Sequence, residues 1–322
     1  MAGEPGTVGE LGEFDLIRAI TARLPSGPDV VIGAGDDAAV VRANDGSVVA
    51  STDLLVEGRH FRRDWSEAYD VGRKAAAQSL ADIAAMGAVP TALLVGLAAP
   101  PALPVPWVLS LADGLRDECQ PVGASVAGGD VVRSDSLCIA VTAFGSLEGR
   151  APVTRAGAQV GDVVAVAGRL GWAAAGYAIL SRGFRSPRVL VEAHRRPSPP
   201  YAKGPQAATL GATAMIDVSD GLVQDLGHVA EASGVLIDLA SGVFEVPEVF
   251  QDTARALSAD PMTWVLGGGE DHALAACFPP ETELPDGWLV VGRVREQGAA
   301  GGAVVLVDGE PYDGPAGWQT FS

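Results

Sequence analysis

The chain of 322 residues is poor in cysteine, in positive charge and in long uninterrupted apolar runs. Cys119, Cys138 and Cys277 are far apart and form no CxxC pair, so neither a disulfide framework nor a zinc site is expected. Lysine and arginine together number 22 against 40 aspartates and glutamates, which gives a formal charge of -18. Such an acidic surface repels nucleic acid and anionic membranes, so neither is an expected partner.

Targeting and membrane-spanning signals are also lacking. The N-terminal stretch MAGEPGTVGELGEFDL has no basic region followed by an apolar core, so it is not read as a secretory signal. Prolines interrupt the most apolar segment, residues 91–112, too often for a membrane span. We therefore expect a soluble cytoplasmic protein, with disorder at residues 1–8.

Length and hydrophobic patterning predict a two-domain α/β protein. Hydrophobic residues make up 48% of the chain and charged residues 19%, as in globular proteins. Short runs rich in valine and isoleucine alternate with longer alanine- and leucine-rich segments of helical period. The boundary is expected near residue 150, which gives an N-terminal domain 1–150 and a C-terminal domain 151–322. The clearest helix runs from about Ser66 to Met86, with Gly87 as its C-terminal cap.

Further elements are expected on both sides of that boundary, whereas residues 194–200 (HRRPSPP) are too rich in proline for regular structure. The expected strands are 91–98, 124–129, 137–147, 162–168, 213–218 and 235–239, and the expected helices are 171–183 and 219–234.

Acidic residues recur in glycine-rich turns. They are Asp36, Asp37, Asp53, Asp130, Asp217, Asp220, Glu270 and Asp271. Any one of them could be an ordinary turn residue. Asp82 differs because it lies within an apolar helical face near the end of the helix, where a negative charge opposes the helix dipole. Together they need compensating cations or protons, since unpaired buried carboxylates cost several kcal/mol each.

A metal is the expected source of that compensation, because few lysines or arginines lie in these motifs. Carboxylates with serine or threonine hydroxyls suit Mg²⁺, which often shares its coordination shell with substrate phosphates. Two like charges 4 Å apart repel by about 4 kcal/mol at an effective dielectric of 20. A polyphosphate facing these carboxylates therefore needs bridging cations, and the pattern points to metal-assisted phosphoryl transfer.

The common nucleotide-binding loops are not found in the sequence. The pattern GxxxxGK[ST] does not occur, and AGRLGWAAAG matches a dinucleotide fingerprint poorly. Any ATP site must therefore use another arrangement. His60 and His272 lie inside the acidic motifs, where a structural and a functional role are equally open, while His194 and His228 are expected on the surface or on a helix.

In this order, the motifs GDDAAV, STDLLVEGRHF, SLADIAAMGA, GGD, TRAGAQVGD, IDVSDGLVQDLGH and GGGEDHAL resemble those of the thiamine-monophosphate kinase family, in the aminoimidazole ribonucleotide synthetase (PurM-like) superfamily. The resemblance extends from Gly12 to Gly317. It implies transfer of the γ-phosphoryl group of ATP to thiamine monophosphate, the last step of thiamine diphosphate synthesis. It also implies an N-terminal domain that forms a β-barrel across a homodimer, with ATP in the groove at that interface, and a C-terminal α/β domain that completes both substrate sites.

The resemblance also assigns site residues. The implied ligands of several Mg²⁺ ions are Asp37, Ser51, Thr52, Asp53, Asp82, Asp130, Asp217 and Asp220. The implied ATP contacts are Gly129, Asp130, Arg155 and Ser219, and the implied thiamine monophosphate contacts are His60, Glu270 and Trp318. The sequence departs from the family pattern at Val131, where threonine is common, and at His272, where tyrosine is common.

The acceptor of this reaction needs no catalytic base. A phosphate monoester has a second pKa near 6, so it is already a nucleophile at pH 7. We expect direct in-line transfer without a phosphoenzyme and without a catalytic side-chain base or nucleophile. Arg155 is expected to donate to nucleotide phosphates. Glu270 is expected to pair with the cationic thiamine ring and Trp318 to stack on it, an attraction of about 0.5 to 2 kcal/mol.

Four alternatives remain open at this stage. Related enzymes cyclise formylglycinamidine ribonucleotide, or phosphorylate selenide or a carbamoyl group, and a metal- or nucleotide-binding regulator without activity is a further possibility. A selenide enzyme would need a reactive cysteine or selenocysteine near its N-terminus, and no cysteine precedes Cys119. Within GAGDDAAV, adjacent residues of an extended chain point to opposite sides. Both aspartates therefore need not serve the same site; the resemblance implies Asp37 as the ligand, and Asp36 is expected to support the loop.

Overall fold

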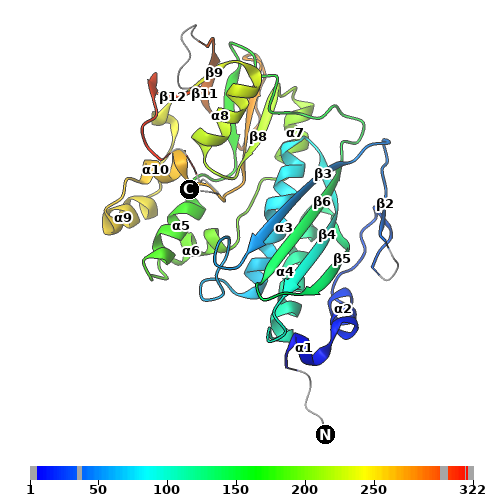
Figure 1. The fold of residues 1–322 in the computed structure, drawn as a ribbon. Coiled ribbons are helices and arrows are strands. Elements are labelled where there is room, and N and C mark those ends of the chain that lie inside the picture. Colours follow the sequence, from blue (N-terminus) through cyan, green and yellow to red (C-terminus); the bar gives the residue numbers. More distant parts are fainter. Residues whose placement is uncertain (1–5, 35–37, 298–303, 316, 318–322) are drawn as a thin grey trace. The chain divides into compact units, whose positions relative to one another are not determined.

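The computed structural model describes residues 6–34, 38–297, 304–315 and 317 (Figure 1). Its chain divides into two compact units, each with its own sheet. The N-terminal unit comprises Met1–Ile83 and Ala88–Gly149, and the C-terminal unit comprises Ala84–Gly87 and Arg150–Ser322. The mixed α/β class expected from the patterning is confirmed.

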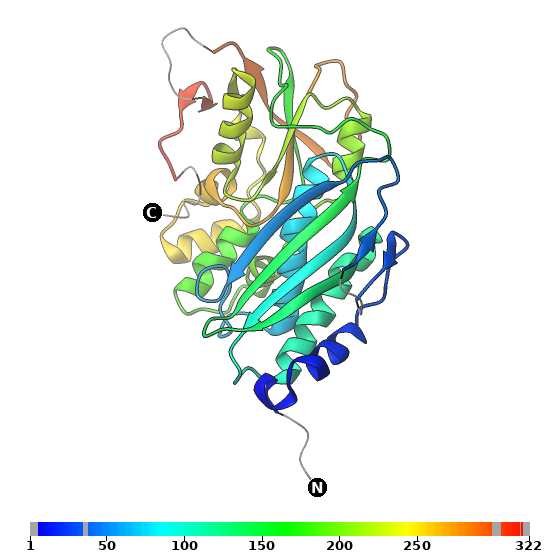
Figure 2. The same ribbon diagram turned by 45° about the vertical axis from the view of Figure 1, so that its right-hand side comes forward.

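The N-terminal unit contains a four-stranded sheet in the order β3-β6-β4-β5. Its strands are β3 (Val49–Val56), β6 (Cys138–Ser146), β4 (Val89–Ala99) and β5 (Ser125–Arg133). Strands β3 and β4 are antiparallel to β6, and β4 is parallel to β5. Helices α3 (Ala68–Ala85) and α4 (Val105–Cys119) lie against one face of this sheet, as Figures 1 and 2 show.

Smaller elements complete this unit. They are α1 (Val8–Leu11), α2 (Glu13–Thr21), the 3-10 helix η1 (Gln120–Val122) and the hairpin strands β1 (Val30–Ile32) and β2 (Val40–Val41). Thr7 and Glu10 form a reciprocal capping box at α1. The expectation of disorder over residues 1–8 is therefore wrong for Thr7 and Val8, which the cap and a hydrogen bond from Val8 N to Leu103 O hold in place.

The position of α3 depends on two glycines. A Cβ atom at Gly72 would lie 2.2 Å from Leu111 O of α4, and one at Gly114 would lie 2.2 Å from Tyr69 O of α3. The two helix backbones therefore approach more closely than any larger residue would permit. The expected helix at Ser66 to Met86 is confirmed to within two residues, and Gly87 ends it at a φ of 75°.

The opposite face of the four-stranded sheet is open within this unit. Along β3, residues Ala50, Thr52 and Leu54 are exposed, whereas the side chains between them turn inward. Leu54 is 56% exposed, and Val132 of β5 is 49% exposed. The outer face thus combines apolar and hydroxyl side chains.

The C-terminal unit contains a seven-stranded sheet in the order β13-β12-β9-β11-β7-β10-β8. Its strands are β7 (Val163–Ala167), β8 (Ala214–Val218), β9 (Leu236–Leu239), β10 (Ala273–Phe278), β11 (Trp288–Arg295), β12 (Val305–Val307) and β13 (Glu310–Pro311). Its helices are α5 (Trp172–Ser181), α6 (Arg188–Arg195), α7 (Lys203–Thr209), α8 (Leu222–Ser233), α9 (Glu248–Leu257), α10 (Pro261–Gly267) and the 3-10 helix η2 (Ser241–Val243).

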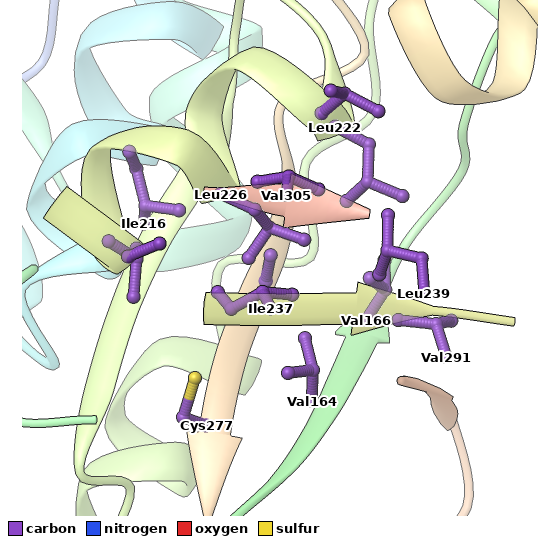
Figure 3. Packing of buried hydrophobic residues seen from close by; sticks show 14 of the residues in the cluster. Val164, Val166, Ile216, Leu222, Leu226, Ile237, Leu239, Cys277, Val291 and Val305 are labelled. Carbon is purple, nitrogen blue, oxygen red and sulfur yellow. The ribbon is translucent and has the colours of Figure 1, made fainter. Parts of the chain in front are cut away.

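Both faces of this sheet are buried at its centre. Alternate side chains of β7 and β8, including Val164 and Ile216, pack with Leu226 of α8 on one face (Figure 3). The intervening side chains, including Ala165 and Met215, pack on the other face with α7. Burial on both faces explains why these strands appear as unbroken apolar runs in the sequence.

Helical structure extends into two proline-rich segments of the chain. Helix α6 extends through Arg195, so the expectation of irregular structure from His194 onward is wrong for its first two residues. Helix α4 begins inside the proline-rich segment because Pro106 occupies its first turn, where the missing N–H costs nothing. Among the described residues, no helix is both long and apolar enough to cross a membrane.

Candidate functional site

Two carboxylates on the inner side of the N-terminal unit are held by serine hydroxyls. Ser51 Oγ on β3 donates to Asp82 Oδ2 on α3 at 2.5 Å. Ser79 Oγ, fully buried on α3, donates to Asp53 Oδ2 on β3 at 2.6 Å. Each bond fixes the orientation of a carboxylate on the inner side of the sheet.

Thr52 lies on the other face of the same strand. Its Oγ1 is 3.0 Å from Thr142 Oγ1 and 3.2 Å from Val141 O, both on β6. Because strand side chains alternate, the hydroxyl of Thr52 points away from Ser51 and Asp53. The structure therefore divides the STD motif between the two faces of the sheet.

Gly129 and Asp130 line a cavity of about 530 Å³ in the N-terminal unit. Apolar residues of α2, α4 and the sheet form most of its wall, among them Ile17, Leu111 and Val126. A Cβ atom at Gly129 would lie 1.9 Å from Val95 O, so only glycine fits this position. The carboxylate of Asp130 is exposed and accepts a hydrogen bond from Val131 N. The cavity has the size and the mainly apolar lining of a small-molecule site.

His60 lies in the loop between β3 and α3. The residue is exposed, its ring nitrogen Nδ1 accepts from Val56 N at 3.0 Å, and its backbone N–H donates to Val56 O at 3.0 Å. This reciprocal pairing fixes the ring against the end of β3.

In the C-terminal unit, Asp217 lies near the end of β8 and pairs with a buried histidine. His272 Nδ1 lies 3.0 Å from Asp217 Oδ2. Asp220 follows in the turn before α8, and Gln224 Nε2 donates to its Oδ2 at 3.1 Å. Burial, with the charge of Asp217 as a further contribution, raises the pKa of Asp220 above its ordinary value.

Asp225 organises this turn. Its Oδ2 accepts hydrogen bonds from the N–H groups of Asp220 and Gly221, each at 3.0 Å. Burial raises the pKa of Asp225 to about 7, and the neighbouring carboxylates of Asp217 and Asp220 add to the shift. Carboxylates whose pKa values rise together in this way form a site that a bound cation would stabilise.

The turn at Gly269 to His272 has an unusual backbone. Glu270 and His272 adopt φ values of 67° and 53°, a region that non-glycine residues rarely occupy. Glu270 N donates to Ser219 O at 2.8 Å, so the turn is bonded to the segment that follows β8. The carboxylate of Glu270 lies 3.2 Å from Nδ1 of the buried His194 on α6.

Asp271 anchors this turn to the start of α5. The residue is buried, and its Oδ1 accepts a hydrogen bond from Ala173 N at 3.0 Å. Burial raises its pKa to about 7, although the helix N–H groups and His272 act in the opposite direction.

Two further predicted residues, Arg155 and Ser219, lie in the C-terminal unit. Arg155 is exposed, and its carbonyl accepts from Ser233 Oγ at 3.2 Å. Ser219 lies directly after β8, with its carbonyl bonded to Glu270 N. Asp37, with its neighbour Asp36, and Trp318 lie outside the described residues.

The donor chemistry fits Mg²⁺. Among residues 6–34, 38–297, 304–315 and 317, no group of three or more histidine, cysteine, aspartate or glutamate side chains is placed to hold a metal. The described carboxylates instead occur in small sets with hydroxyl or amide partners. Such oxygen donors leave coordination positions for phosphate oxygens and water, as Mg²⁺ sites commonly do.

Sequence reasoning did not single out three residues that the structure brings into these sites. Ser79 precedes Asp82 by three residues, which places both on one face of α3, and that spacing could have indicated it. Asp225 lies in the first turn of α8, where an acidic side chain is favoured by the helix dipole, and that position could have indicated it. The contact of His194 with Glu270 joins segments 76 residues apart, and no local pattern could have shown it.

Comparisons with known proteins agree with this arrangement. Residues 35–147 match the family model described as AIR synthase related protein, N-terminal domain. A thiamine-monophosphate kinase of Mycobacterium tuberculosis is 49% identical over 322 residues, which cover 100% of this chain and 95% of the relative. One of Corynebacterium glutamicum is 40% identical over 324 residues, which cover 98% and 95%.

Solved structures of thiamine-monophosphate kinases also match nearly the whole chain. A structure described as AaThiL complexed with AMPPCP and TMP has a TM-score of 0.79 and 32% identity, and the match covers 98% of each chain. A thiamine-monophosphate kinase from Stenotrophomonas maltophilia has a TM-score of 0.78 and 29% identity, covering 92% of this chain and 96% of the other. The hydrogenase maturation protein HypE, at 18% identity and a TM-score of 0.72, shares the fold.

Proposed function

The chain belongs to the thiamine-monophosphate kinase family, and from this we propose that it transfers the γ-phosphoryl group of ATP to thiamine monophosphate, giving thiamine diphosphate and ADP. The relative solved with AMPPCP, an ATP analogue, and TMP supports both substrates. As a member of this family, the protein is a kinase.

The observation that carries the proposal is the pairing of Asp53 and Asp82 with serine hydroxyls on the inner side of the N-terminal sheet. A hydroxyl donor fixes the orientation of each carboxylate, and a carboxylate is a hard oxygen ligand of the kind that Mg²⁺ prefers. Preorganised oxygen ligands of this kind are expected where polyphosphates must approach carboxylates.

Several Mg²⁺ ions would be held by Asp37, Ser51, Thr52, Asp53, Asp82, Asp130, Asp217 and Asp220. Bound Mg²⁺ would neutralise phosphate oxygens and so lower the repulsion between the two anionic substrates. For Thr52, the outward direction of its hydroxyl favours coordination through the main-chain carbonyl.

ATP would be bound by Gly129, Asp130, Arg155 and Ser219. The mainly apolar cavity beside Gly129 and Asp130 suits an adenine base, with its phosphates directed toward Asp130. Arg155 would donate to phosphate oxygens. Val131 supplies no hydroxyl at the position where threonine is common in the family.

Thiamine monophosphate would be bound by His60, Glu270 and Trp318. The carboxylate of Glu270 would pair with the cationic ring, and Trp318 would stack on it, for about 0.5 to 2 kcal/mol. His194, at 3.2 Å from Glu270, would hold that carboxylate in place.

The chemistry requires positioning rather than a base. Because the acceptor phosphate is ionised at pH 7, attack on the γ-phosphorus is direct and in line, with no phosphoenzyme. Exchange of label between ADP and ATP in the absence of thiamine monophosphate would contradict this direct route.

The open face of the N-terminal sheet would pair with a second copy of the chain to close a barrel in a cytoplasmic homodimer. Its exposed Leu54 and Val132 suit burial at such an interface. Leu54→Glu should therefore shift the protein toward monomer in size-exclusion chromatography with light scattering, whereas Val160→Glu, another exposed apolar position on the C-terminal unit, should not.

The decisive assay combines the protein with ATP, Mg²⁺ and thiamine monophosphate and detects thiamine diphosphate by fluorescence after oxidation. We expect product that depends on both substrates and on Mg²⁺. Absence of product, together with turnover of formylglycinamidine ribonucleotide, selenide or a carbamoyl substrate, would move the chain to a sibling activity. Nucleotide binding without any turnover would identify a regulator.

A further inference from the structure

Lys74 is one of only two lysines in the chain, the other being Lys203, and it is buried in α3. Only 3% of Lys74 is exposed, and its Nζ donates to the carbonyl oxygen of His60 at 3.2 Å. A buried ammonium group is costly unless it is hydrogen-bonded, so this contact constrains the loop as well as the lysine.

The loop that Lys74 contacts is short and fixed at both ends. Val56 ends β3, and Phe61, 3% exposed, anchors the far side of the loop in the core. Gly58 has a φ of 84° and donates to Phe61 O at 2.8 Å, which closes the turn. His60 lies between these anchors, bonded to Val56 through its backbone N–H and its ring, and to Lys74 through its carbonyl.

This geometry determines the tautomer of His60. The N–H of Val56 can only donate, so the ring nitrogen Nδ1 that faces it at 3.0 Å must accept. A neutral ring that accepts at Nδ1 carries its proton on Nε2. The exposed edge of the ring therefore presents one N–H donor, which suits an anionic oxygen.

The surroundings of His60 favour an anion as well. Arg59, Arg62 and Arg63 lie within three residues of it, in a chain whose formal charge is -18. Arg62 pairs with Asp64, and Arg63 pairs with Glu57 at 2.6 Å. With Glu57 and Asp64 counted, residues 57–64 carry three arginines against two acids, so this loop has one net positive charge in an acidic chain.

We propose that Lys74 is a positioning residue, which holds the His60 loop so that the Nε2–H group of His60 donates to the phosphate of thiamine monophosphate. The identity of that phosphate rests on the proposed function, whereas the tautomer and the role of Lys74 can be tested without any substrate.

The first test is long-range ¹H–¹⁵N NMR of the free full-length protein with ¹⁵N-labelled histidine. The chain has four histidines, and His60→Gln identifies the signal of His60. We expect a neutral Nε2–H signature at His60 in the wild type. Lys74→Met should convert it to a mixture of tautomers, while Lys203→Met should leave it unchanged. Lys203 is a matched control because its Nζ also donates to a backbone carbonyl, that of Asp286.

A second measurement needs no variant and so does not depend on the stability of Lys74→Met. Acylation of the folded wild type, followed by mass spectrometry, should modify Lys203 and leave Lys74 protected until the protein is unfolded. Rapid acylation of Lys74, or an Nδ1–H signature at His60 in the free protein, would overturn the positioning role.

The third test addresses the ligand. Thiamine monophosphate should shift the Nε2 resonance of His60, whereas thiamine, which lacks the phosphate, should not. Equal shifts from both would overturn the phosphate assignment. Lys74→Met should raise the KM for thiamine monophosphate by roughly tenfold or more and leave the KM for ATP unchanged. If Lys74→Met releases a fixed tautomer of His60 but the protein has no activity on thiamine monophosphate, the proposed function is refuted. The role of Lys74 in holding His60 would still stand.

Discussion

The imidazole of His272 lies 3.0 Å from the carboxylate of Asp217, and both side chains are buried in the C-terminal unit. The contact follows from strand register, because β10 begins directly after His272 and pairs antiparallel with β8, Ala273 opposite Val218. The N–H of His272 also donates to Val218 O at 3.1 Å. His272 therefore orients Asp217, a predicted metal ligand.

We expect His272→Phe to weaken metal binding. The substitution keeps an aromatic ring but removes the nitrogen beside Asp217, and loss of such a supporting contact typically lowers metal affinity about 10- to 100-fold. The Mg²⁺ concentration for half-maximal activity should rise accordingly, and the increase in melting temperature on adding Mg²⁺ should shrink. An unchanged Mg²⁺ dependence by both measures would show that His272 only fills space.

Asp53→Asn and Asp82→Asn should each lower turnover by orders of magnitude and raise the Mg²⁺ requirement. Asparagine preserves the shape of each side chain and can still accept from Ser79 or Ser51, so the fold should persist. Asp64→Asn is the matched control, because Asp64 is exposed and pairs with Arg62 on the surface. Wild-type kinetics in both Asp53→Asn and Asp82→Asn would exclude these carboxylates as ligands.

The neighbouring aspartates of the GAGDDAAV motif should differ in their effects. Both lie outside the described residues, so the expectation rests on the family resemblance, which implies Asp37 as a ligand, and on the alternation of side chains along an extended chain. Asp37→Asn should reduce turnover by orders of magnitude, and Asp36→Asn should have a clearly milder effect. Steady-state kinetics over a range of Mg²⁺ concentrations would compare them, and equal losses would reassign Asp36 as a functional residue.

Much of the fold could be predicted because local pattern and tertiary structure agree. The helix α3 has an alanine-rich sequence and a terminal glycine, and β7 and β8 are apolar runs bounded by turns. The hydrogen-bond partners of site residues could not be predicted in the same way. Ser79 reaches Asp53 across 26 positions, and this contact depends on the position of α3, which packs closely against α4 at Gly72.

The division of Ser51 and Thr52 between two faces illustrates a further limit. A sequence motif shows which residue types are adjacent, whereas strand alternation and pairing with Thr142 decide where each hydroxyl points. Likewise, the alanine-rich pattern of α3 gives no sign of the hydrogen bond from Lys74 to the carbonyl oxygen of His60.

Asp271 should make the stability of the free protein depend on pH. Burial raises its pKa from 3.8 to about 7 in the folded protein, so between these values the folded state binds a proton that the unfolded state has released. The contribution to stability is complete below about pH 4 and is lost as the pH rises toward 7. A shift of about 3 units at 1.36 kcal/mol each limits the effect to about 4 kcal/mol.

Asp271→Asn removes this ionisation while keeping an oxygen that can accept from Ala173 N. The free energy of unfolding of the wild type should therefore fall relative to that of the variant as the pH rises from about 4 to 7. Urea denaturation of both proteins, without Mg²⁺ and at half-unit pH intervals, measures this difference directly. A difference that stays constant across the range would mean that Asp271 does not titrate there, and one that changes in the opposite direction would mean that its carboxylate is stabilised as the anion by the start of α5.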